Sequence, residues 1–373
     1  MSRAIPAVLA LGLCLAVGQP LQNRVLIARS ADGLAWQRTG TILCDSADVP
    51  EALRGPDGRF HVYYQGLWDP YHDGIMVAVS EDGLSGWERH QVSIPGTESW
   101  PGRPCDPDII LFDDTFRLYF TGDPLGDGFP ETHSAVSLDG WNFALEAGTR
   151  FEVTSRMVLD PSLLRTGDTL QYFAGGAAPG ANWHAHSTDG LDFARQADVA
   201  VDSLMLSNGV ALDSGYRFYG FKNMLPCGIK SVFSADGGLW TLEPGWRLQL
   251  DSTGNLEYSY VKDAAVVGTD SGFIMYYVTR KREAALNDVG ETGDRWPKPV
   301  PTIAGGMLRL PTDPSTSSSP GRLLDISGRA VLLLKPGAND VSRLSPGVYF
   351  VRERLAASGE RSAVSIRKVV VTR

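Results

Sequence analysis

Short apolar runs rich in aromatic residues alternate with Gly- and Asp-rich turns between about residues 24 and 280. Runs of this kind, bounded by turn residues, predict β-strands. Five of the turns share the sequence Ser-x-Asp-Gly, and their serines are spaced by 50, 57, 50 and 47 residues. The Gly after Asp supplies the positive φ that a tight hairpin needs. The five segments are Ser30–Trp36, Ser80–Trp87, Ser137–Phe143, Ser187–Phe193 and Ser234–Trp240.

A second set of five hairpins interlocks with the first, and each has an aromatic second strand. Together the two sets give units of four strands at a nearly fixed period, which is typical of a repeat architecture such as a propeller. The five hairpins are Pro50–Gln65, Asp106–Gly122, Asp160–Ala174, Asn208–Phe221 and Asp263–Val278.

The two ends of the repeat region each hold half a unit. The first hairpin, Val25–Gly40, is of the Ser-x-Asp-Gly type, and the last, Asp263–Val278, is of the aromatic type. Pairing them completes a fifth unit and hides the sheet edges that would otherwise template aggregation. We therefore predict an all-β fold, with a five-bladed β-propeller over residues 24–280 that its terminal hairpins close. The alternative is an unclosed β-sandwich.

The N-terminus has the pattern of an export signal. Residues 1–20 hold Arg3, an apolar run from Ala7 to Val17 and then Gly-Gln-Pro, which is the length of a signal peptide and too short to span a bilayer. Lipidation at Cys14 is not expected because Leu13 precedes it. No later segment is expected to cross a membrane.

Beyond the repeats, residues 281–321 are rich in proline and serine and predict an extended linker. Residues 322–373 contain short strand-like runs and predict a small β-sandwich-like domain. Three of its segments resemble the C-terminal sorting domain of type IX secretion, over about residues 304–373: Leu324–Arg329, Leu344–Arg352 and Arg367–Val371.

That resemblance implies contact with the secretion machinery, export across the outer membrane, and a secreted or cell-surface location. The alternative is a generic β-sandwich that binds carbohydrate or packs on the propeller. The protein is expected to be a monomer.

Charge is divided unevenly along the chain. Residues 281–373 hold 15 Lys/Arg against 9 Asp/Glu, whereas the preceding residues hold 19 against 34. An acidic propeller argues against nucleic-acid binding, which needs a cationic surface, and suits a neutral ligand such as a glycan.

Beyond the signal, Cys44, Cys105 and Cys227 allow at most one disulfide. Pairing of Cys44 with Cys105 is conceivable, and buried thiols are the simpler interpretation.

Chemistry is expected on the propeller face that carries the longer connections, because function concentrates on loops held by a rigid scaffold. Aromatic side chains on these loops are candidates for stacking on sugar rings, and they could equally cap the core between blades. They are Trp68, Trp100, Phe129 and Trp183.

Acidic and amide residues recur where the innermost strand of each blade begins. Carboxyl groups that converge in one cavity raise one another's pKa, as acid/base catalysis requires. The plain alternative is that Asp before Pro caps a turn. The catalytic candidates are Asp48, Asp106 and Asp160, and the further ligand-binding candidates are Asp108, Asn208 and Asp263.

These Asp-Pro strands, aromatic strands and Ser-x-Asp-Gly turns resemble the five-bladed furanosidase superfamily of arabinanases, xylosidases and invertases. The resemblance implies that Asp48 is the general base and that Asp106 tunes the pair. Asp160 would then be the third carboxyl, although the family's acid is a Glu in a motif absent here. Other possible acids are Glu51, Glu98, Glu131 and Glu257.

No cofactor is expected. His184 and His186 alternate on one strand and could bind a metal, but packing is the simpler interpretation, and no loop has the spacing of a calcium site.

The leading hypothesis is a secreted glycoside hydrolase acting on extracellular polysaccharide or oligosaccharide. The rivals are a non-catalytic surface propeller that binds glycan or protein and, last, a sialidase.

Overall fold

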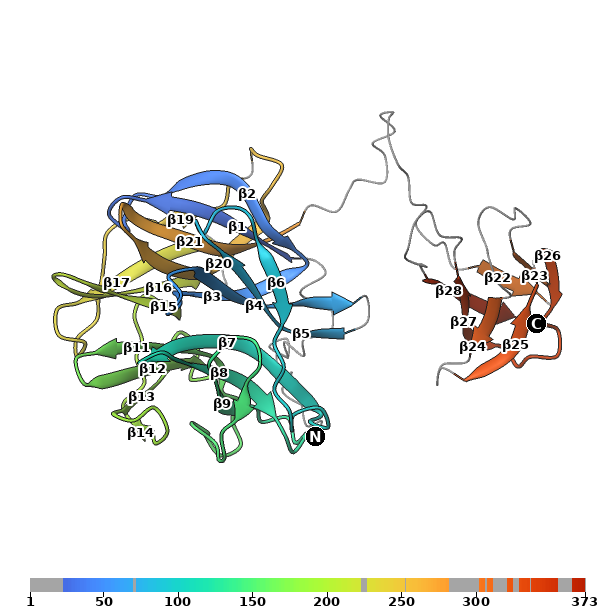
Figure 1. Cartoon of the computed structure of the whole chain (residues 1–373), viewed down its shortest axis with the longest axis horizontal. Helices are drawn as coiled ribbons and strands as arrows, with labels where there is room; N and C mark the ends of the chain where they lie inside the picture. The colour runs from blue at the N-terminus through green and yellow to red at the C-terminus, as the bar shows by residue number, and fades with distance from the viewer. Residues whose placement is uncertain are drawn as a thin grey trace, which may run out of the picture. The chain divides into compact units, whose positions relative to one another are not determined.

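A computed structural model describes residues 23–69, 72–222, 227–251 and 253–281 of the repeat region, and 302–305, 307–310, 321–324, 329–335, 337–354 and 364–372 beyond it. Every regular element among these residues is a β-strand (Figure 1). The chain divides into two compact units, Met1–Ala284 and Ala285–Arg373. The predicted export signal lies outside the described residues.

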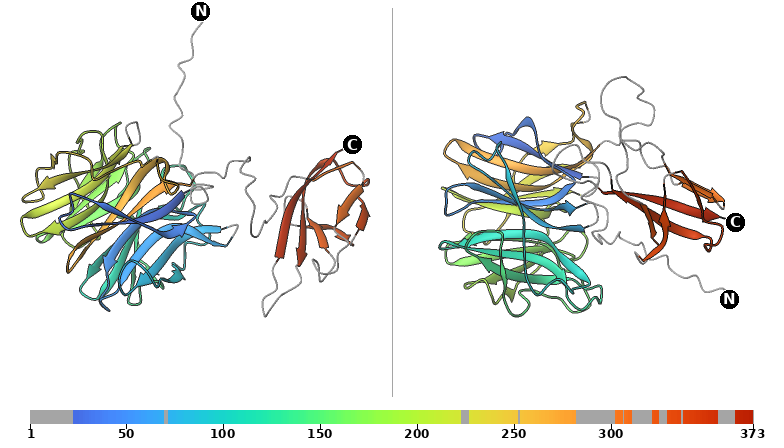
Figure 2. Two further views of the ribbon diagram at one scale, coloured as in Figure 1. Left: turned by 90° about the horizontal axis from the view of Figure 1, so that it is seen from above. Right: turned by 45° about the vertical axis from the view of Figure 1, so that its right-hand side comes forward.

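The first unit consists of five antiparallel sheets of the kind predicted, each built from a set of four strands (Figures 1 and 2). The blades, from the innermost strand outward, are β3 (Ala47–Arg54), β4 (Phe60–Asp69), β5 (His72–Ser80) and β6 (Glu88–Gln91); β7 (Gly102–Phe112), β8 (Thr115–Asp123), β9 (Glu131–Ser137) and β10 (Ala144–Leu145); β11 (Leu159–Thr166), β12 (Thr169–Gly175), β13 (Trp183–Ser187) and β14 (Ala194–Arg195); β15 (Met205–Leu212), β16 (Gly215–Lys222), β17 (Gly228–Ser234) and β18 (Thr241–Leu242), with β19 (Leu248–Gln249) beside β17; and β20 (Tyr258–Thr269), β21 (Gly272–Arg280), β1 (Asn23–Ser30) and β2 (Gln37–Asp45).

The fifth blade joins the two ends of the repeat region. Strand β1 pairs with β21 without interruption from Asn23 opposite Arg280 to Ser30 opposite Phe273. Val25 and Ile27 of β1 are fully buried against Tyr276 and Val278 of β21, so apolar packing reinforces the ladder. The predicted closure is confirmed, and the unclosed sandwich is excluded.

Each innermost strand is interrupted by an irregularity in its pairing. In the first three blades and in the fifth, two consecutive residues of the innermost strand have no matched partner, whereas the next strand skips only one residue. This is the pattern of a β-bulge. The matched residue just after the irregularity is Glu51, Asp108, Ser162, Asn208 or Ala265, and each faces an aromatic residue of the next strand. These five positions are therefore equivalent around the ring.

The repeated Ser-x-Asp-Gly turns each connect the two outer strands of one blade and lie against the neighbouring blade. In each, the Ser Oγ accepts a hydrogen bond from the Gly backbone N–H, and the Asp carboxylate holds the backbone that follows. At four interfaces a buried tyrosine of the neighbouring blade donates to the Gly carbonyl. The pairs are Tyr63–Gly140 at 2.7 Å, Tyr119–Gly190 at 2.9 Å, Tyr219–Gly33 at 2.9 Å and Tyr276–Gly83 at 2.8 Å.

The second unit contains a five-stranded sheet in the order β22-β28-β27-β24-β25 and the two-stranded pair β23-β26. Leu308 of β23 and Leu323 of β24 belong to one buried cluster, so the two sheets share a core. Strands β22 and β23 come from the range predicted as a linker, so regular structure begins earlier than residue 322. The seven strands are β22 (Thr302–Gly305), β23 (Met307–Leu310), β24 (Gly321–Leu324), β25 (Ala330–Leu334), β26 (Gly337–Asp340), β27 (Gly347–Arg354) and β28 (Val364–Thr372).

Among the described residues no helix is long and apolar enough to cross a membrane. The three described cysteines, Cys44, Cys105 and Cys227, are half-buried and form no disulfide.

Candidate functional site

Three of the predicted aspartates occupy equivalent positions at the heads of innermost strands. Asp106, Asp160 and Asp263 lie within the bulges of β7, β11 and β20, with φ of 50°, 51° and 43°. This left-handed conformation is uncommon for any residue except glycine, although Asp tolerates it better than most. Strain of this kind concentrates at functional sites and is a reason to look for chemistry there.

Asp48 does not occupy the same position. In β3 the left-handed residue is Val49, with φ of 42°, and Asp48 precedes it. The proline that forms the second residue of these bulges carries the signal: Val49-Pro50 aligns with Asp106-Pro107 and Asp160-Pro161. The sequence interpretation had placed Asp48 with the other aspartates, so its alignment was one residue out.

Asp48 is 1% exposed and is held by three donors. Its Oδ1 lies 3.0 Å from Lys262 Nζ and accepts the Val49 N–H at 3.1 Å, while its Oδ2 accepts Asn23 Nδ2 at 2.8 Å. Tyr260 donates in turn to Asn23 Oδ1 at 2.5 Å. These contacts fix the orientation of the Asp48 side chain.

Lys262, at the head of β20, is the cation of this cluster. Its Nζ also lies 2.6 Å from Asp263 Oδ2. Burial alone would lower the pKa of Lys262, but the charges of Asp263 and Asp48 outweigh burial and raise it well above its usual value. Burial raises the pKa of Asp263 to about 6, and Lys262 opposes the rise.

Asp106 and Asp160 are half-buried. Burial raises the pKa of Asp106, and the charge of Asp48 adds to the rise. The pKa of Asp160 is raised well above its ordinary value, first by burial and then by the charges of Asp106 and Asp263. Thr121 Oγ1 accepts the Asp160 N–H at 3.2 Å and fixes this strand head against the second blade. Asp160 therefore keeps its proton to a higher pH than an ordinary aspartate does.

A buried polar layer lies beside the cluster, at the equivalent ring positions after the irregularities. Asp108 Oδ2 accepts the Leu163 N–H at 3.1 Å, and Asn208 donates to Glu51 Oε1 at 2.7 Å. Asn208 Oδ1 also accepts the Val266 N–H at 2.9 Å.

This layer joins blades and is closed to solvent. Burial raises the pKa of Asp108 to about 8, and burial together with the charge of Asp108 raises that of Glu51. Asp108, Asn208 and Asp263, predicted as ligand-binding residues, are all buried in the described structure.

The predicted aromatic residues are placed differently from one another. Phe129 is 43% exposed, and Trp100 is half-buried against the His133 ring, with centroids 4.7 Å apart. Trp183 is 2% exposed, with Arg156 and Arg195 over its ring, so it caps the core of its blade. Trp68 belongs to β4, but its side chain lies outside the described residues.

Two of the other candidate acids already have partners. Glu98 is exposed and accepts the Gly96 N–H at 2.8 Å. Glu131 lies 3.0 Å from His133 Nε2 and accepts the Thr149 hydroxyl at 3.1 Å.

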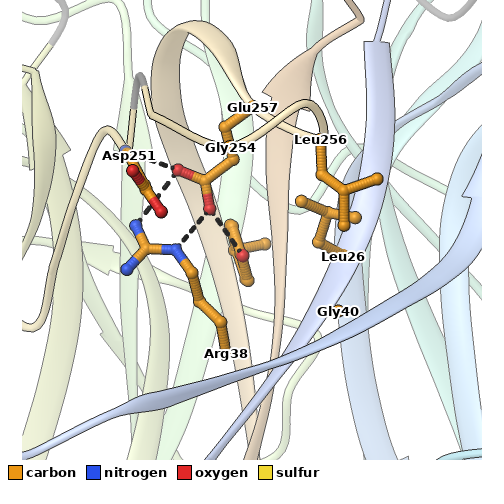
Figure 3. Close-up of a pocket in the computed structure, with 8 residues that line it drawn as sticks. Leu26, Arg38, Gly40, Asp251, Gly254, Leu256 and Glu257 are labelled. Atoms are coloured by element: carbon orange, nitrogen blue, oxygen red, sulfur yellow. Dashed lines mark hydrogen bonds and ion pairs between the residues drawn. The ribbon is translucent and has the colours of Figure 1, made fainter.

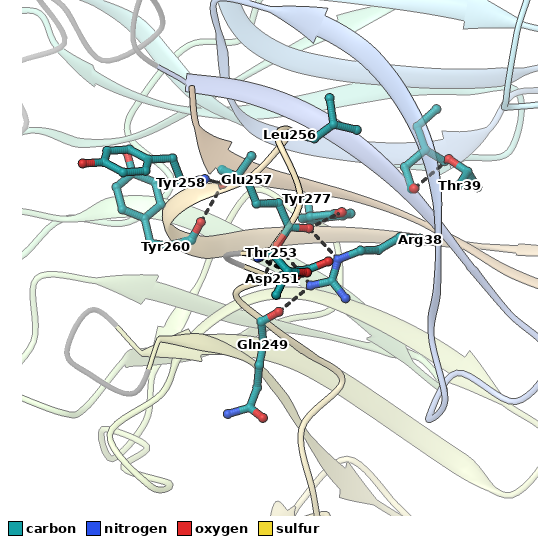
Figure 4. Close-up of polar contacts among 12 residues, drawn as sticks. Arg38, Thr39, Gln249, Asp251, Thr253, Leu256, Glu257, Tyr258, Tyr260 and Tyr277 are labelled. Atoms are coloured by element: carbon teal, nitrogen blue, oxygen red, sulfur yellow. Dashed lines mark hydrogen bonds and ion pairs between the residues drawn. The ribbon is translucent and has the colours of Figure 1, made fainter. Parts of the chain in front are cut away.

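Glu257 lines a cavity of about 110 Å³ between strands of the fifth blade and the connection that joins β19 to β20 (Figure 3). It accepts Arg38 Nε at 2.6 Å, Arg38 Nη2 at 3.0 Å, the Tyr277 hydroxyl at 2.8 Å and the Asp251 N–H at 2.8 Å. Arg38 also donates to the Gln249 carbonyl (Figure 4). Because four hydrogen bonds hold the two carboxylate oxygens of Glu257, this group is a structural anchor.

The histidine pair is accounted for by packing. His184 Nε2 lies 2.9 Å from Gln171 Oε1, and its ring stacks on Phe173 with centroids 4.7 Å apart. Across the described ranges, no three His, Cys, Asp or Glu side chains are grouped as ligands for a metal ion.

Sequence reasoning missed Lys262, Asn23 and Tyr260 as members of the cluster. Asn23 and Tyr260 reach Asp48 through the closure of the ring, which joins residues more than 200 positions apart. The predicted pairing of the terminal hairpins held the necessary information, because it brings β1 and β20 into one blade beside β3.

No family model and no curated protein matches the sequence. Among solved structures, a thermostable family-43 glycoside hydrolase superposes with a TM-score of 0.50 at 14% identity, over 68% of this chain and 96% of that chain. The α-L-arabinofuranosidase of Clostridium thermocellum ATCC 27405 gives a TM-score of 0.50 at 16% identity, over 61% and 80%. The propeller shares the fold of these glycosidases. The predicted resemblance of residues 24–280 is thus confirmed for the fold.

Proposed function

We propose that the propeller is a secreted glycoside hydrolase that cleaves an extracellular polysaccharide or oligosaccharide by carboxyl acid/base chemistry. The observation that carries the proposal is the pair Asp106 and Asp160. Both are half-buried, both take the left-handed conformation, and both have raised pKa values in a cluster where Lys262 bridges Asp48 and Asp263. The shared fold with family-43 glycosidases supports the same class of substrate.

In the proposed reaction Asp160 is the proton donor. Its proton passes to the glycosidic oxygen as the bond from that oxygen to the anomeric carbon breaks. Asp106 takes a proton from the water whose oxygen forms the new bond to the same carbon. A general base with a raised pKa works close to the operating pH, where proton transfer is most effective.

Asp48 fits a different role from that of general base, which the resemblance implied. A general base must reach the water that it deprotonates, whereas Asp48 is buried and its oxygens are held by Lys262, Asn23 and Val49. In the proposal it supplies a fixed negative charge that raises the pKa of Asp106.

The test is hydrolysis of arabinan, xylan, fructan and mannan by the wild-type protein and by variants. Asp160→Asn and Asp106→Asn are each expected to lower kcat by roughly 10²–10⁴-fold, the usual contribution of a general acid or base. Asp168→Asn, in the exposed turn of the same blade as Asp160, is the matched control and should keep full activity. Turnover that survives both substitutions would contradict the proposal.

A second candidate function is glycan binding without catalysis. The observation in its favour is the saturated, buried state of Asp48, the residue that the resemblance made the base. Under this alternative the wild-type protein binds a glycan in isothermal titration calorimetry but releases no reducing ends. Asp160→Asn would then leave the affinity unchanged.

Export and surface attachment form a separate part of the proposal, supported by the sequence pattern of residues 1–20 and by the sorting-domain resemblance. Cell fractionation of the full chain and of chains lacking residues 1–20 or 304–373 tests this part. Each deletion is expected to keep the protein from the cell surface.

A further inference from the structure

Lys262 stands among the carboxyl groups of the candidate site as their shared counter-ion. Its Nζ bridges Asp48 Oδ1 of β3, at 3.0 Å, and Asp263 Oδ2 of its own strand, at 2.6 Å. Its side chain is 18% exposed, so water screens these contacts only in part. The bridge crosses the boundary between the fifth and the first blade.

The position of Lys262 follows from the strand register. It is the matched residue just before the bulge of β20, which is the place that Asp48, Cys105 and Leu159 hold in the first three blades. The same ring position therefore supplies a cation in the fifth blade and its anionic partner in the first.

Other groups hold this pair in place. Asn23 of β1 bonds the second oxygen of Asp48, and Tyr260 of β20 bonds Asn23. Asp106 of β7 and Asp160 of β11 also interact with the charges of Lys262 and Asp48.

We propose that Lys262 is a positioning residue: its ammonium group holds Asp48 and Asp263 together across the blade boundary and favours the ionised forms of Asp106, Asp160 and Asp263. This inference rests on the proposed function for its catalytic part. Its electrostatic part concerns the ionisation of Asp106, Asp160 and Asp263 and stands without any substrate.

The physical argument is the effect of a charge at short range. An opposite charge within about 4–6 Å favours the ionised carboxyl and lowers its pKa by about 1–3 units. Removing the ammonium therefore raises the pKa values of the aspartates around it.

The first experiment compares Lys262→Met with the wild-type protein by ¹³C NMR titration of the aspartate carboxyl carbons. The midpoint of Asp263 is expected to rise from about 6 by about 1 unit or more. Lys262→Arg keeps the charge and should hold the midpoint near its wild-type value. Unchanged midpoints in Lys262→Met would overturn the proposal.

Lys230→Met is the matched control. Lys230 is 17% exposed and lies 2.6 Å from Asp202 Oδ2, so it makes an ion pair of the same length at the same exposure on another strand. Its loss should leave the Asp263 midpoint unchanged. If Lys230→Met moves that midpoint as far as Lys262→Met does, the shift comes from the change in the protein's net charge. The proposed role of Lys262 is then contradicted.

On a substrate that the wild-type protein hydrolyses, both limbs of the pH–rate profile of Lys262→Met should move to higher pH, because the base and the acid both become harder to ionise. Limbs that stay in place would contradict the catalytic part alone. A wild-type protein with no turnover would defeat the proposed function, and the NMR titration would still decide the electrostatic part.

Asp263→Asn is the second variant if Lys262→Met does not fold. It keeps the ammonium and removes one carboxylate that acts on Asp160, so the Asp160 midpoint should fall. An Asp160 midpoint that stays or rises would count against the proposal.

Discussion

Asp108 shows how burial at a single residue ties the stability of the propeller to pH. Its side chain lies in the core of the ring, with one oxygen bonded to the Leu163 N–H and the other without a hydrogen-bond partner among the described residues. Leaving such a group charged would be costly, and burial accordingly raises the pKa of Asp108 to about 8 from an ordinary 3.8. The folded state therefore keeps a proton that the unfolded chain has lost.

This difference predicts the sign of the pH dependence. Between about pH 4 and pH 8 the folded state binds more protons than the unfolded state, so the free energy of unfolding falls as pH rises. The contribution of Asp108 is fully present below pH 3.8 and is lost as pH passes about 8. Asp108→Asn should weaken the dependence in this window, measured by urea denaturation at several pH values.

In the Asp108→Asn variant, Glu51 is expected to retain part of the pH dependence of the free energy of unfolding, because burial also raises the pKa of Glu51. Asp168→Asn, on an exposed turn, is the control and should follow the wild-type curve. A slope for Asp108→Asn that equals the wild-type slope would show that Asp108 is ionised in the folded protein.

The repeated turn is the element that the sequence displays most clearly and whose role only the structure explains. The Ser and Asp side chains close the hairpin locally, as the Asp-Gly pattern predicts. The Gly carbonyl then accepts a tyrosine hydroxyl from the neighbouring blade. At the corresponding position of the third blade stands Phe173, which has no hydroxyl to donate.

Removing one of these hydroxyls should weaken one interface between blades. Tyr276→Phe keeps the ring and leaves the buried Gly83 carbonyl without its donor. We expect a loss of about 1 kcal/mol in the free energy of unfolding, measured by chemical denaturation. Tyr258→Phe, 45% exposed, should cost less than about 0.5 kcal/mol. Equal losses for the two variants would show that the interblade bond contributes nothing.

The bulges mark the limit of what the sequence predicts at this scale. Alternation and turn residues predict where strands run, but a bulge adds one residue and shifts every position before it. The bulge has the same length in β3 and β7, so it does not explain the mismatch of Asp48 with Asp106: the left-handed residue of β3 is Val49, and Val49-Pro50 aligns with Asp106-Pro107. The partners of Asp48 come from β1 and β20, so they follow only once the register across the closure is known.

At the scale of the molecule, circular closure was the prediction that placed the candidate site. Paired termini put the heads of the five innermost strands around one axis, and the charge interactions among Asp48, Asp106, Asp160 and Asp263 follow from that arrangement. The individual pairings depend on side-chain geometry within the ring, which a repeat pattern does not contain.

Because strand pairing closes the ring, we predict that the propeller tolerates circular permutation. Asn23 and Arg280 are opposite each other in the β1–β21 ladder, so a short Gly/Ser linker can join residue 281 to residue 23. A permutant opened in the exposed Asp213–Ser214 turn should unfold within about 4 °C of the parent.

Loss of the first hairpin is the contrasting variant. A chain lacking residues 23–45 exposes one edge of β21 and should aggregate. Thermal unfolding and size-exclusion chromatography measure both outcomes. A truncated chain that stays monomeric and folds at the parent's temperature would show that closure contributes nothing to the integrity of the ring.

The ladder that seals the ring also determines how the propeller withstands pulling. The chain leaves the propeller from β21, which is hydrogen-bonded to β1 on one side and β20 on the other. Inter-strand bonds in antiparallel sheets run perpendicular to the strands. Tension along β21 therefore loads both ladders in shear, with many bonds sharing the force, instead of unzipping them one at a time. A propeller tethered through its C-terminal side would resist drag at the place where its ends meet.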